Sequence, residues 1–312
     1  MVGFAFRETE EAAAEVTRLF DFVWPTAVAL WNLRWQVDGF LSAVPGASYE
    51  DVASRFVLGS DIAGADIRAM RDRITWDQQK ERFAEFILTN AFAIYESWAG
   101  RILTLSNVSG MRDSDLYTVG NGTSKGLAAF ISRVTTQPSS MMQLAFQPSF
   151  MKHRKVHVNE QENLLRCYKY FKEIRNCPIH RGSIADQRAI DALNDFLPVS
   201  SAASLKSKER VECLPLALGD RVKLSLRGAV GLCDIVLKML ATVDAQLSSS
   251  ETAEKAVLQR LRAATPIQRV LGSKASSVEN KIKKICRVAN LPPPSDVEAV
   301  KRFLLQHRLV SL

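Results

Sequence analysis

The sequence has few of the residues that build metal centres and disulfide frameworks. Five cysteines and four histidines are spread over 312 residues, and no two cysteines form a CxxC pair. An odd number of separated cysteines is typical of a reducing compartment, and zinc sites need clustered ligands. The histidines lie near no group of acids that would complete a metal site. We therefore disfavour a metal-dependent enzyme and expect neither a metal nor another cofactor.

Long apolar runs and targeting signals are also lacking. The most apolar early stretch, residues 20–35, is interrupted by Pro25 and contains Asp21 and Arg34. It falls short of the ~20 apolar residues that span a bilayer. The first residues, with Glu8 soon after the start, do not follow the basic-then-apolar order of a signal peptide. We expect a cytoplasmic protein with no membrane partner.

The net charge of +8 is concentrated near the end of the chain. Residues 251–312 carry twelve lysines and arginines against five acids, so nearly all of the excess lies there. Such a basic region suits a polyanion. Its densest part holds our predicted nucleic-acid contacts, Lys281, Lys283, Lys284 and Arg287. An acidic protein partner would suit the same charges, and a merely solvated basic helix is an equal alternative.

Helical periodicity dominates the N-terminal part. Residues 8–40 form one helical stretch, in which Trp24, Trp31 and Trp35 recur at i, i+7 and i+11. Pro25 is expected to bend this helix or to split it in two. Tryptophans at such spacing are more often core residues than ligand stackers. An exposed set would instead mark a partner surface.

The clearest helix is predicted over residues 76–106. Apolar residues three and four apart form a single stripe along it, namely Phe83, Ile87, Ala91, Ile94, Trp98, Ile102 and Leu105. Further helices are predicted from about residue 127 and over residues 159–175, 184–196 and 230–247, and three short helices follow residue 250. Segment 120–126 contains Ser124-Lys125 but lacks the order of a phosphate-binding loop, so we interpret it as a plain loop.

Two segments break the helical pattern. Residues 211–226 carry Gly219-Asp220 between alternating apolar residues, which predicts a small hairpin or an extended arm. Ser248-Ser249-Ser250 is polar and precedes the rise in basic charge, so we place a domain boundary there. We expect an N-terminal helical extension at 1–75, a central domain at 76–247 and a basic helical region at 251–312.

One segment carries residues suited to RNA cleavage. Arg175, Asn176 and His180 lie within Arg175-Asn176-Cys177-Pro178-Ile179-His180. Metal-free cleavage needs a base for the ribose 2′-hydroxyl and a cation for the phosphate, and histidine and arginine suit these roles. In an unbroken helix these two side chains would point ~140° apart. We expect Pro178 to end the helix soon after Arg175 and to let His180 fold back.

This segment resembles the Arg-x4–6-His signature of the HEPN (higher eukaryotes and prokaryotes nucleotide-binding) superfamily, in which a polar residue usually follows the arginine, as Asn176 does. In that family two long antiparallel helices precede the signature and further helices follow it. The resemblance covers about residues 76–247. It implies an all-α fold, a HEPN-like antiparallel helical bundle, to which the sequence adds a small hairpin or extended arm and extra terminal helices.

The resemblance also implies a function. It implies a metal-independent endoribonuclease that leaves a 2′,3′-cyclic phosphate, with a composite active site in a homodimer. Arg175 would contact the scissile phosphate, His180 would act as base or acid, and Asn176 would orient the backbone or phosphate. Family members often serve as toxins or antiphage defence effectors, so an inhibitor or a defence-system partner protein is also expected.

Alternative interpretations stay open. The same fold could serve a non-catalytic module that binds nucleic acid or dimerises, and Arg175 and His180 could merely cap a helix end. Glu96 is either an active-site support or a solvated charge on a helix. Arg181 is a further predicted nucleic-acid contact. His153, four residues before the histidine at 157, is interpreted as part of a basic surface because cationic neighbours disfavour a metal.

Overall fold

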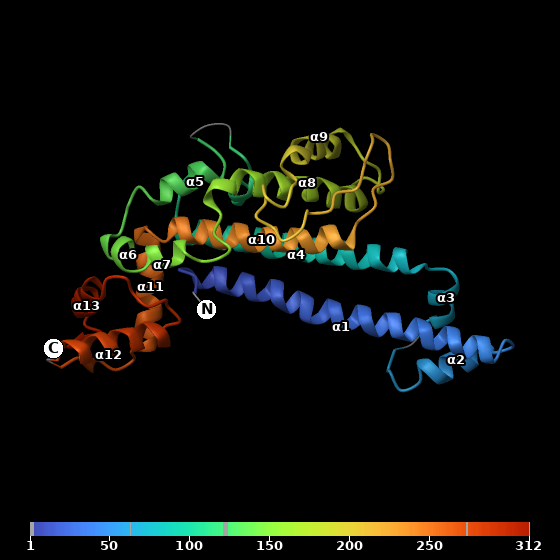
Figure 1. The fold of residues 1–312 in the computed structure, drawn as a ribbon, viewed down its shortest axis with the longest axis horizontal. Coiled ribbons are helices and arrows are strands. Elements are labelled where there is room, and N and C mark those ends of the chain that lie inside the picture. The colour runs from blue at the N-terminus through green and yellow to red at the C-terminus, as the bar shows by residue number, and fades with distance from the viewer. Residues whose placement is uncertain (1–2, 63, 121–123, 273, 312) are drawn as a thin grey trace.

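The computed structural model describes residues 3–62, 64–120, 124–272 and 274–311. Within these residues the expected all-α fold is confirmed, since the only sheet they form is a parallel pair of two-residue strands. Figure 1 shows an elongated molecule with its helices roughly along the long axis. The predicted loop at 120–126 lies partly at 121–123, outside the described residues.

Three long helices form the centre of the molecule. α10 packs along α4, and α1 lies against both of them (Figure 1). α10 is apolar on nearly all sides, as expected of a helix that neighbours surround, and most of its residues are buried. These helices are α1 (Arg7–Ala43), α4 (Trp76–Ser106) and α10 (Leu226–Leu247).

The remaining elements cover this centre. α8 and α9 pack on each other, and α8 also contacts α4 and α10. α2 and α3 lie beside the far end of α1, and α11, α12 and α13 gather at the opposite end (Figure 1). In chain order these elements are α2 (Tyr49–Phe56), α3 (Ile67–Asp72), η1 (Asp113–Tyr117), α5 (Leu127–Val134), α6 (Ser140–Ala145), α7 (Gln147–Met151), η2 (Val158–Glu160), α8 (Gln161–His180), α9 (Gln187–Phe196), η3 (Leu197–Val199), α11 (Glu251–Ala264), β1 (Arg269–Val270), α12 (Ala275–Val288), α13 (Val297–Gln306) and β2 (Val310–Ser311).

The bounds predicted for α4 are confirmed at both ends. Thr75 and Gln78 form a reciprocal capping box at the N-terminus, and Asn107 ends the helix in the left-handed conformation. The predicted stripe faces the core except at its last member, Leu105, which is 44% exposed. Trp98 is fully buried and donates its indole N–H to Thr9 Oγ1 at 3.0 Å. α4 therefore forms a fixed platform for the helices that cross it.

α1 differs from its prediction in two ways. It runs as one helix through Pro25, which neither splits it nor ends it. The proline is exposed, and so is Asp21, whose carbonyl loses its helical partner and can bind water instead. The tryptophans are not core residues, because Trp24, Trp31 and Trp35 are 42%, 39% and 62% exposed. α10 begins part-way along α1, so the end of α1 next to α2 and α3 extends beyond it (Figure 1).

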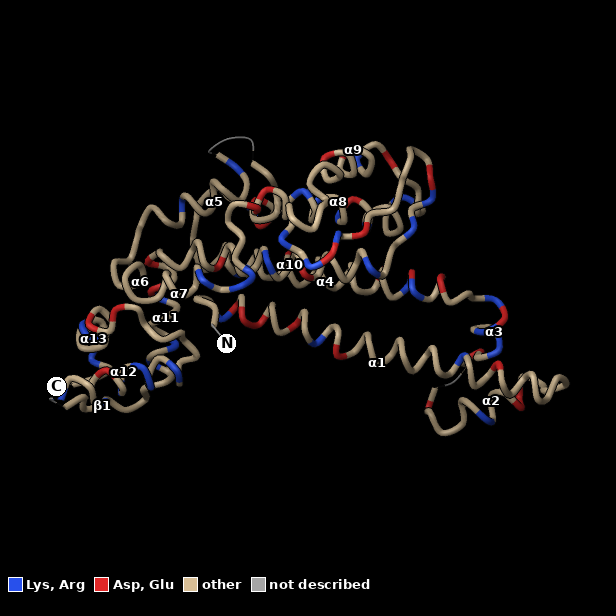
Figure 2. The backbone as a smooth tube through the Cα atoms, in the orientation of Figure 1, with Lys and Arg blue, Asp and Glu red and all other residues tan. Residues whose placement is uncertain are grey.

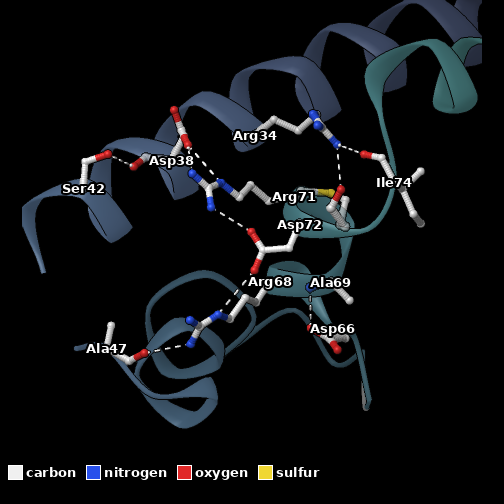
Figure 3. Close-up of polar contacts among 11 residues, drawn as sticks. Arg34, Asp38, Ser42, Ala47, Asp66, Arg68, Ala69, Arg71, Asp72 and Ile74 are labelled. Carbon is white, nitrogen blue, oxygen red and sulfur yellow. Dashed lines mark hydrogen bonds and ion pairs between the residues drawn. The ribbon is translucent and has the colours of Figure 1, made fainter. Parts of the chain in front are cut away.

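Two arginines, Arg34 and Arg71, link the far end of α1 to α3 and to the turn after it (Figure 3). Arg34 donates to the carbonyl oxygens of Met70 at 2.6 Å and Ile74 at 2.8 Å, which fixes the turn between α3 and α4. Arg71 of α3 pairs with Asp38 of α1 at 2.6 Å. These contacts hold α3 against α1.

The segment before α10 is an extended arm rather than a hairpin. Residues 211–225 lack helix, and the arm pairs with the stretch after α8 through one isolated bridge between Ile184 and Arg221. Gly219, with a φ of 84°, forms the turn, and its N–H donates to Ala185 O at 3.0 Å. The arm therefore ties the end of α8 to the start of α10.

The serine triplet is a packed junction. Ser248, Ser249 and Ser250 are buried, and the N–H of Ser139 donates to Ser249 O at 2.8 Å. The hydroxyl of Ser250 caps α11. These backbone groups find partners in the segment before α6, and the domain boundary expected at this triplet stays a prediction. The three-part division stays a prediction, although buried residues from each part join one hydrophobic cluster. The three short helices expected after residue 250 are confirmed.

Candidate catalytic site on α8

α8 does not end where the sequence indicated. The helix continues through Pro178 to His180, so the expected break after Arg175 was wrong. Pro178 stands in the last turn, where only one internal hydrogen bond is lost. The N–H groups of Arg181 and Ser183 both donate to the carbonyl of Cys177, at 2.9 and 3.0 Å, and close the helix after the proline.

The unbroken helix separates the two predicted catalytic side chains. Five residues of α-helix rotate the direction of a side chain by about 500° and advance it about 7.5 Å, so Arg175 and His180 point ~140° apart. They cannot hold the same phosphate within one protomer. The arginine faces α4, whereas the histidine is exposed at the end of the helix.

Arg175 is held on the surface of α4. Its side chain is only 16% exposed, and its guanidinium lies over the ring of Phe92, 4.9 Å from the centroid. Its Nη2 atom is 4.0 Å from Glu96 Oε1. Its Nε is buried and finds no hydrogen-bond partner among the described residues. Arg175 is thus positioned with an unused donor.

Glu96 is brought into the site, as one interpretation of the sequence allowed. It accepts a hydrogen bond of 2.9 Å from Lys172, one turn before Arg175 on α8. The Lys172 ammonium lies over the ring of Tyr117 at 4.1 Å. Sequence reasoning missed Lys172, although its i, i+3 spacing from Arg175 was a usable signal. Two cations and one carboxylate therefore meet at the crossing of α4 and α8.

The tyrosines beside this cluster, Tyr117 and Tyr168, are not suited to act as a base. Burial, and next the carboxylate of Glu96, raise the pKa of Tyr117 to about 12. Tyr168 is buried beside it, and burial raises its pKa as well. Burial also raises the pKa of Cys177, which disfavours thiolate chemistry. A proton acceptor must come from elsewhere.

Asn176 and His180 lie outside the cluster. Asn176 is half-buried and His180 is exposed, and neither side chain makes a hydrogen bond to the described residues. Arg181, predicted to contact nucleic acid, is instead held by Glu173 at 3.1 Å and Asp186 at 2.8 Å. Its guanidinium ties α8 to the cap of α9 and is already neutralised.

The predicted basic contacts on α12 have different environments. Lys281 donates to the carbonyl oxygens of residues 270 and 271, and Lys283 pairs with Glu279 at 2.5 Å. Lys284 and Arg287 are exposed and have no side-chain partner among the described residues. Figure 2 shows Lys and Arg along this end of the molecule. Two of the four residues are therefore available to a polyanion.

A large cavity lies apart from the motif. It has a volume of about 920 Å³ and is bordered by Trp24, by the first turns of α4 and by the extended arm. No residue of the 175–180 segment borders it. The candidate site on α8 is therefore supported by its residue types and not by a cavity.

The described residues contain no ready-made metal site. No three His, Cys, Asp or Glu side chains among them are grouped to hold an ion. His153 packs against Phe4 with ring centroids 5.4 Å apart, and burial lowers its pKa. Across the same described ranges, no helix is both long and apolar enough to cross a bilayer.

Comparison with known proteins gives no family or function for this chain. No protein-family model matches the chain, and neither a curated protein nor a solved structure matches it. The HEPN resemblance therefore stays a prediction that depends on the sequence of the α8 segment and on the helices predicted around it.

Proposed function

We propose that this protein is a HEPN-like, metal-independent endoribonuclease that works as a homodimer. The observation that carries the proposal is the placement of Arg175, which Phe92 and Glu96 hold in a fixed position at the same end of α8 that exposes His180. A phosphate-binding cation and a solvent-facing imidazole on one helix are the two groups that such cleavage needs.

The divergence of the two side chains supports a composite site. Because Arg175 and His180 of one chain point ~140° apart, a single protomer cannot apply both to one phosphate. A second copy can supply its own His180 opposite the first copy's Arg175. This is the arrangement that the family resemblance implies.

The proposed roles follow from the chemistry of each group. His180 takes the proton of the ribose 2′-hydroxyl, whose oxygen then attacks the adjacent phosphorus. Arg175, with Lys172 beside it, neutralises the charge that develops on the phosphate oxygens. Water protonates the departing 5′-oxygen and then takes the proton from His180, so the products are a 2′,3′-cyclic phosphate and a 5′-hydroxyl. Asn176 orients the phosphate. Lys284 and Arg287 add affinity for RNA.

The biological role is part of the proposal. A cytoplasmic toxin or antiphage defence effector would use this activity against host or phage RNA, under the control of an inhibitor or a defence-system partner protein. A housekeeping RNA-processing enzyme would carry the same residues.

A second candidate is a non-catalytic module that binds nucleic acid or dimerises. The neutralisation of Lys172 by Glu96 and the depth of Arg175 favour it, because a half-buried ion pair of this kind also serves structure alone. Under this interpretation Arg175 locks α8 onto α4, and His180 is a surface residue.

Cleavage of end-labelled RNA in EDTA tests the proposal. Wild type is expected to give 2′,3′-cyclic phosphate ends, and Arg175→Ala and His180→Ala are each expected to lower the rate by ~10²-fold or more. Arg166→Ala is the matched control, because Arg166 lies on α8 in an exposed pair with Glu162. Inactive wild type would favour the non-catalytic module, and full activity in both variants would show that cleavage does not depend on Arg175 and His180.

A further inference from the structure

The cavity beside the extended arm has no part in the proposed catalytic steps. Its volume of about 920 Å³ lies within the range of small-molecule binding sites. α4 and α10 both begin at its edge, and the arm lines it between them. One tryptophan, several leucines, four cations and three acids border it. We call it the arm cavity, and its mixed lining restricts what it can bind.

Two of the four cations in the arm cavity are free to bind an anion. Arg221 and Lys223 are exposed, and neither pairs with a side chain in the described parts of the chain. Val222 between them is buried, so the two cations lie on the same side of the arm. The other two cations are already neutralised by acids. These pairs are Lys80 with Asp77 at 2.7 Å and Arg227 with Glu209 at 2.8 Å.

Trp24 offers an aromatic surface in the same cavity. Its side chain is 42% exposed, and Phe20 packs on it with ring centroids 5.4 Å apart. Phe20 does not border the cavity, so it supports the indole without blocking it. Leu214 and Val230 add apolar surface. A flat ring suits these groups, because every nucleobase has a face that stacks on an aromatic side chain.

The remaining acids discriminate between anionic ligands. Glu81 accepts from the N–H of Leu224 at 3.4 Å, and Glu212 accepts from the hydroxyl of Ser225. Neither carboxylate has a cationic partner within the residues that the structure describes. They would repel a polyphosphate or an acidic peptide, whereas they can accept hydrogen bonds from the amino groups of a nucleobase. The arm cavity therefore matches a single phosphate joined to a polar ring.

We propose that the arm cavity binds a nucleotide. The base lies against Trp24, its amino groups donate to the free carboxylates, and its phosphate is held by Arg221 and Lys223. A free nucleotide and a nucleotide within single-stranded RNA share this chemistry.

The position of the cavity favours RNA as the source of the nucleotide. The N–H of Val222 donates to Ser183 O at 2.8 Å, and Ser183 lies three residues after His180. The arm that carries the two free cations is thus bonded to the end of α8. A strand bound at that end can place a neighbouring nucleotide in the cavity. The choice of RNA rests on the proposed function, whereas the nucleotide chemistry rests on the cavity alone.

Fluorescence anisotropy with a labelled single-stranded oligonucleotide tests the site in the full-length protein. Its riboses carry 2′-O-methyl groups, so binding is measured without cleavage. Trp24→Ala is expected to raise the Kd about tenfold or more, and Trp24→Phe, which keeps a stacking ring, should restore most of the affinity. Trp35→Ala is the matched control, because Trp35 is exposed on the same helix but does not border the cavity. Circular dichroism verifies that each variant is folded.

The salt dependence of binding tests the two cations. Replacing both Arg221 and Lys223 with glutamine is expected to raise the Kd about tenfold and to lower the slope of log Kd against log salt by about 0.7, the value for one phosphate contact of a single strand. Replacing both Lys152 and Arg154 with glutamine is the control for net charge. Both are exposed and lie away from the cavity, so this change should leave the slope as it is.

Competition by adenosine monophosphate distinguishes the two sources of the nucleotide. Weak competition supports RNA, and competition as strong as that of the unlabelled oligonucleotide supports a free nucleotide in the same cavity. The proposal is overturned if neither probe binds, if Trp24→Ala and the double variant both bind like wild type, or if a polyglutamate peptide displaces the oligonucleotide better than adenosine monophosphate does.

Cleavage of ordinary RNA by the same samples separates this proposal from the proposed function. A wild type that binds through the cavity but does not cleave would refute the ribonuclease and leave the nucleotide site in place. A wild type that cleaves, with a Kd that no cavity substitution changes, would refute the nucleotide site alone.

Discussion

Glu96 Oε1 on α4 lies 2.9 Å from the Nζ of Lys172 on α8, and the same oxygen is 4.0 Å from Arg175 Nη2. One carboxylate thus serves two cations that are three residues apart on the crossing helix. In the resting protein it balances one of their two positive charges and holds Lys172 directly. A phosphate that enters must compete with this carboxylate or displace it.

Replacing Glu96 with glutamine is predicted to separate RNA binding from turnover. Glu96→Gln keeps the shape but removes the negative charge, so Lys172 and Arg175 attract phosphate more strongly while losing their anchor. We expect KM for RNA to fall or stay constant and kcat to fall about tenfold. Steady-state cleavage assays measure both constants. If Glu96 is only a solvated charge, neither constant should change. Glu85→Gln is the control, because Glu85 lies on the same helix and pairs with Arg82, away from α8.

Complementation between inactive variants is predicted if the site is shared. Arg175→Ala and His180→Ala are each inactive alone, but a mixed dimer holds one site with an intact Arg175 from one chain and an intact His180 from the other. An equimolar mixture is expected to recover up to about a quarter of wild-type activity after subunit exchange, since half of the dimers are mixed and each has one of two sites. Two active sites that each lie within a single chain would give no recovery.

The features that hydrophobic periodicity determines, such as the bounds of a long helix, could be predicted from the sequence. The bounds of α4 were correct at both ends because its apolar stripe is continuous and Thr75 caps it locally. The proline rules failed at Pro25 and Pro178. Both prolines lie where a lost backbone bond is tolerable, Pro25 on an exposed face and Pro178 in a final turn. Local rules cannot foresee those positions, because they depend on what surrounds the helix.

The candidate site was predictable only in part. Arg175 and His180 were found from residue type and spacing, but their divergence depends on the continuation of α8. The sequence left two interpretations of Glu96, because its approach to α8 is a contact between residues 76 positions apart. The ion pair of Lys172 also joins two helices and was not predictable, although the spacing of Lys172 from Arg175 on one helix was a usable signal. The burial of the tryptophans was misjudged because no local signal shows where α10 stops covering α1.

Removing a buried lysine is predicted to destabilise the fold strongly. Lys238 of α10 is almost wholly buried and pairs with Asp234 at 2.6 Å, and it donates to Leu205 O at 2.9 Å and Ser207 Oγ at 3.0 Å. Lys238→Met leaves those acceptors without their donor, so we expect the free energy of unfolding to fall by about 3 kcal/mol. Urea denaturation measures it. Lys169→Met, in an exposed pair, should change it by less than about 1 kcal/mol.

The stability of the protein is predicted to fall as the pH rises from about 4 to 7. Asp244 is fully buried in α10, and burial raises its pKa to about 7, against the opposing effect of the N–H groups of Ala5 and Phe6 that donate to it at 2.8 and 3.1 Å. Thr9 and Arg260 also face this carboxyl and lower its pKa.

The direction of this pH effect follows from how many protons the folded and unfolded states bind. The unfolded chain releases the Asp244 proton near its ordinary pKa of 3.8, whereas the folded chain keeps the proton until about pH 7. Between these values the folded state holds more protons, so raising the pH favours unfolding, by about 3 kcal/mol from this group between pH 4 and 7. Asp244→Asn removes the titration. Urea midpoints measured across this range should slope downward in the wild type, and the slope should be clearly smaller in Asp244→Asn. Equal slopes in the two proteins would mean that Asp244 is already ionised in the folded state near pH 4, because its backbone donors then outweigh burial.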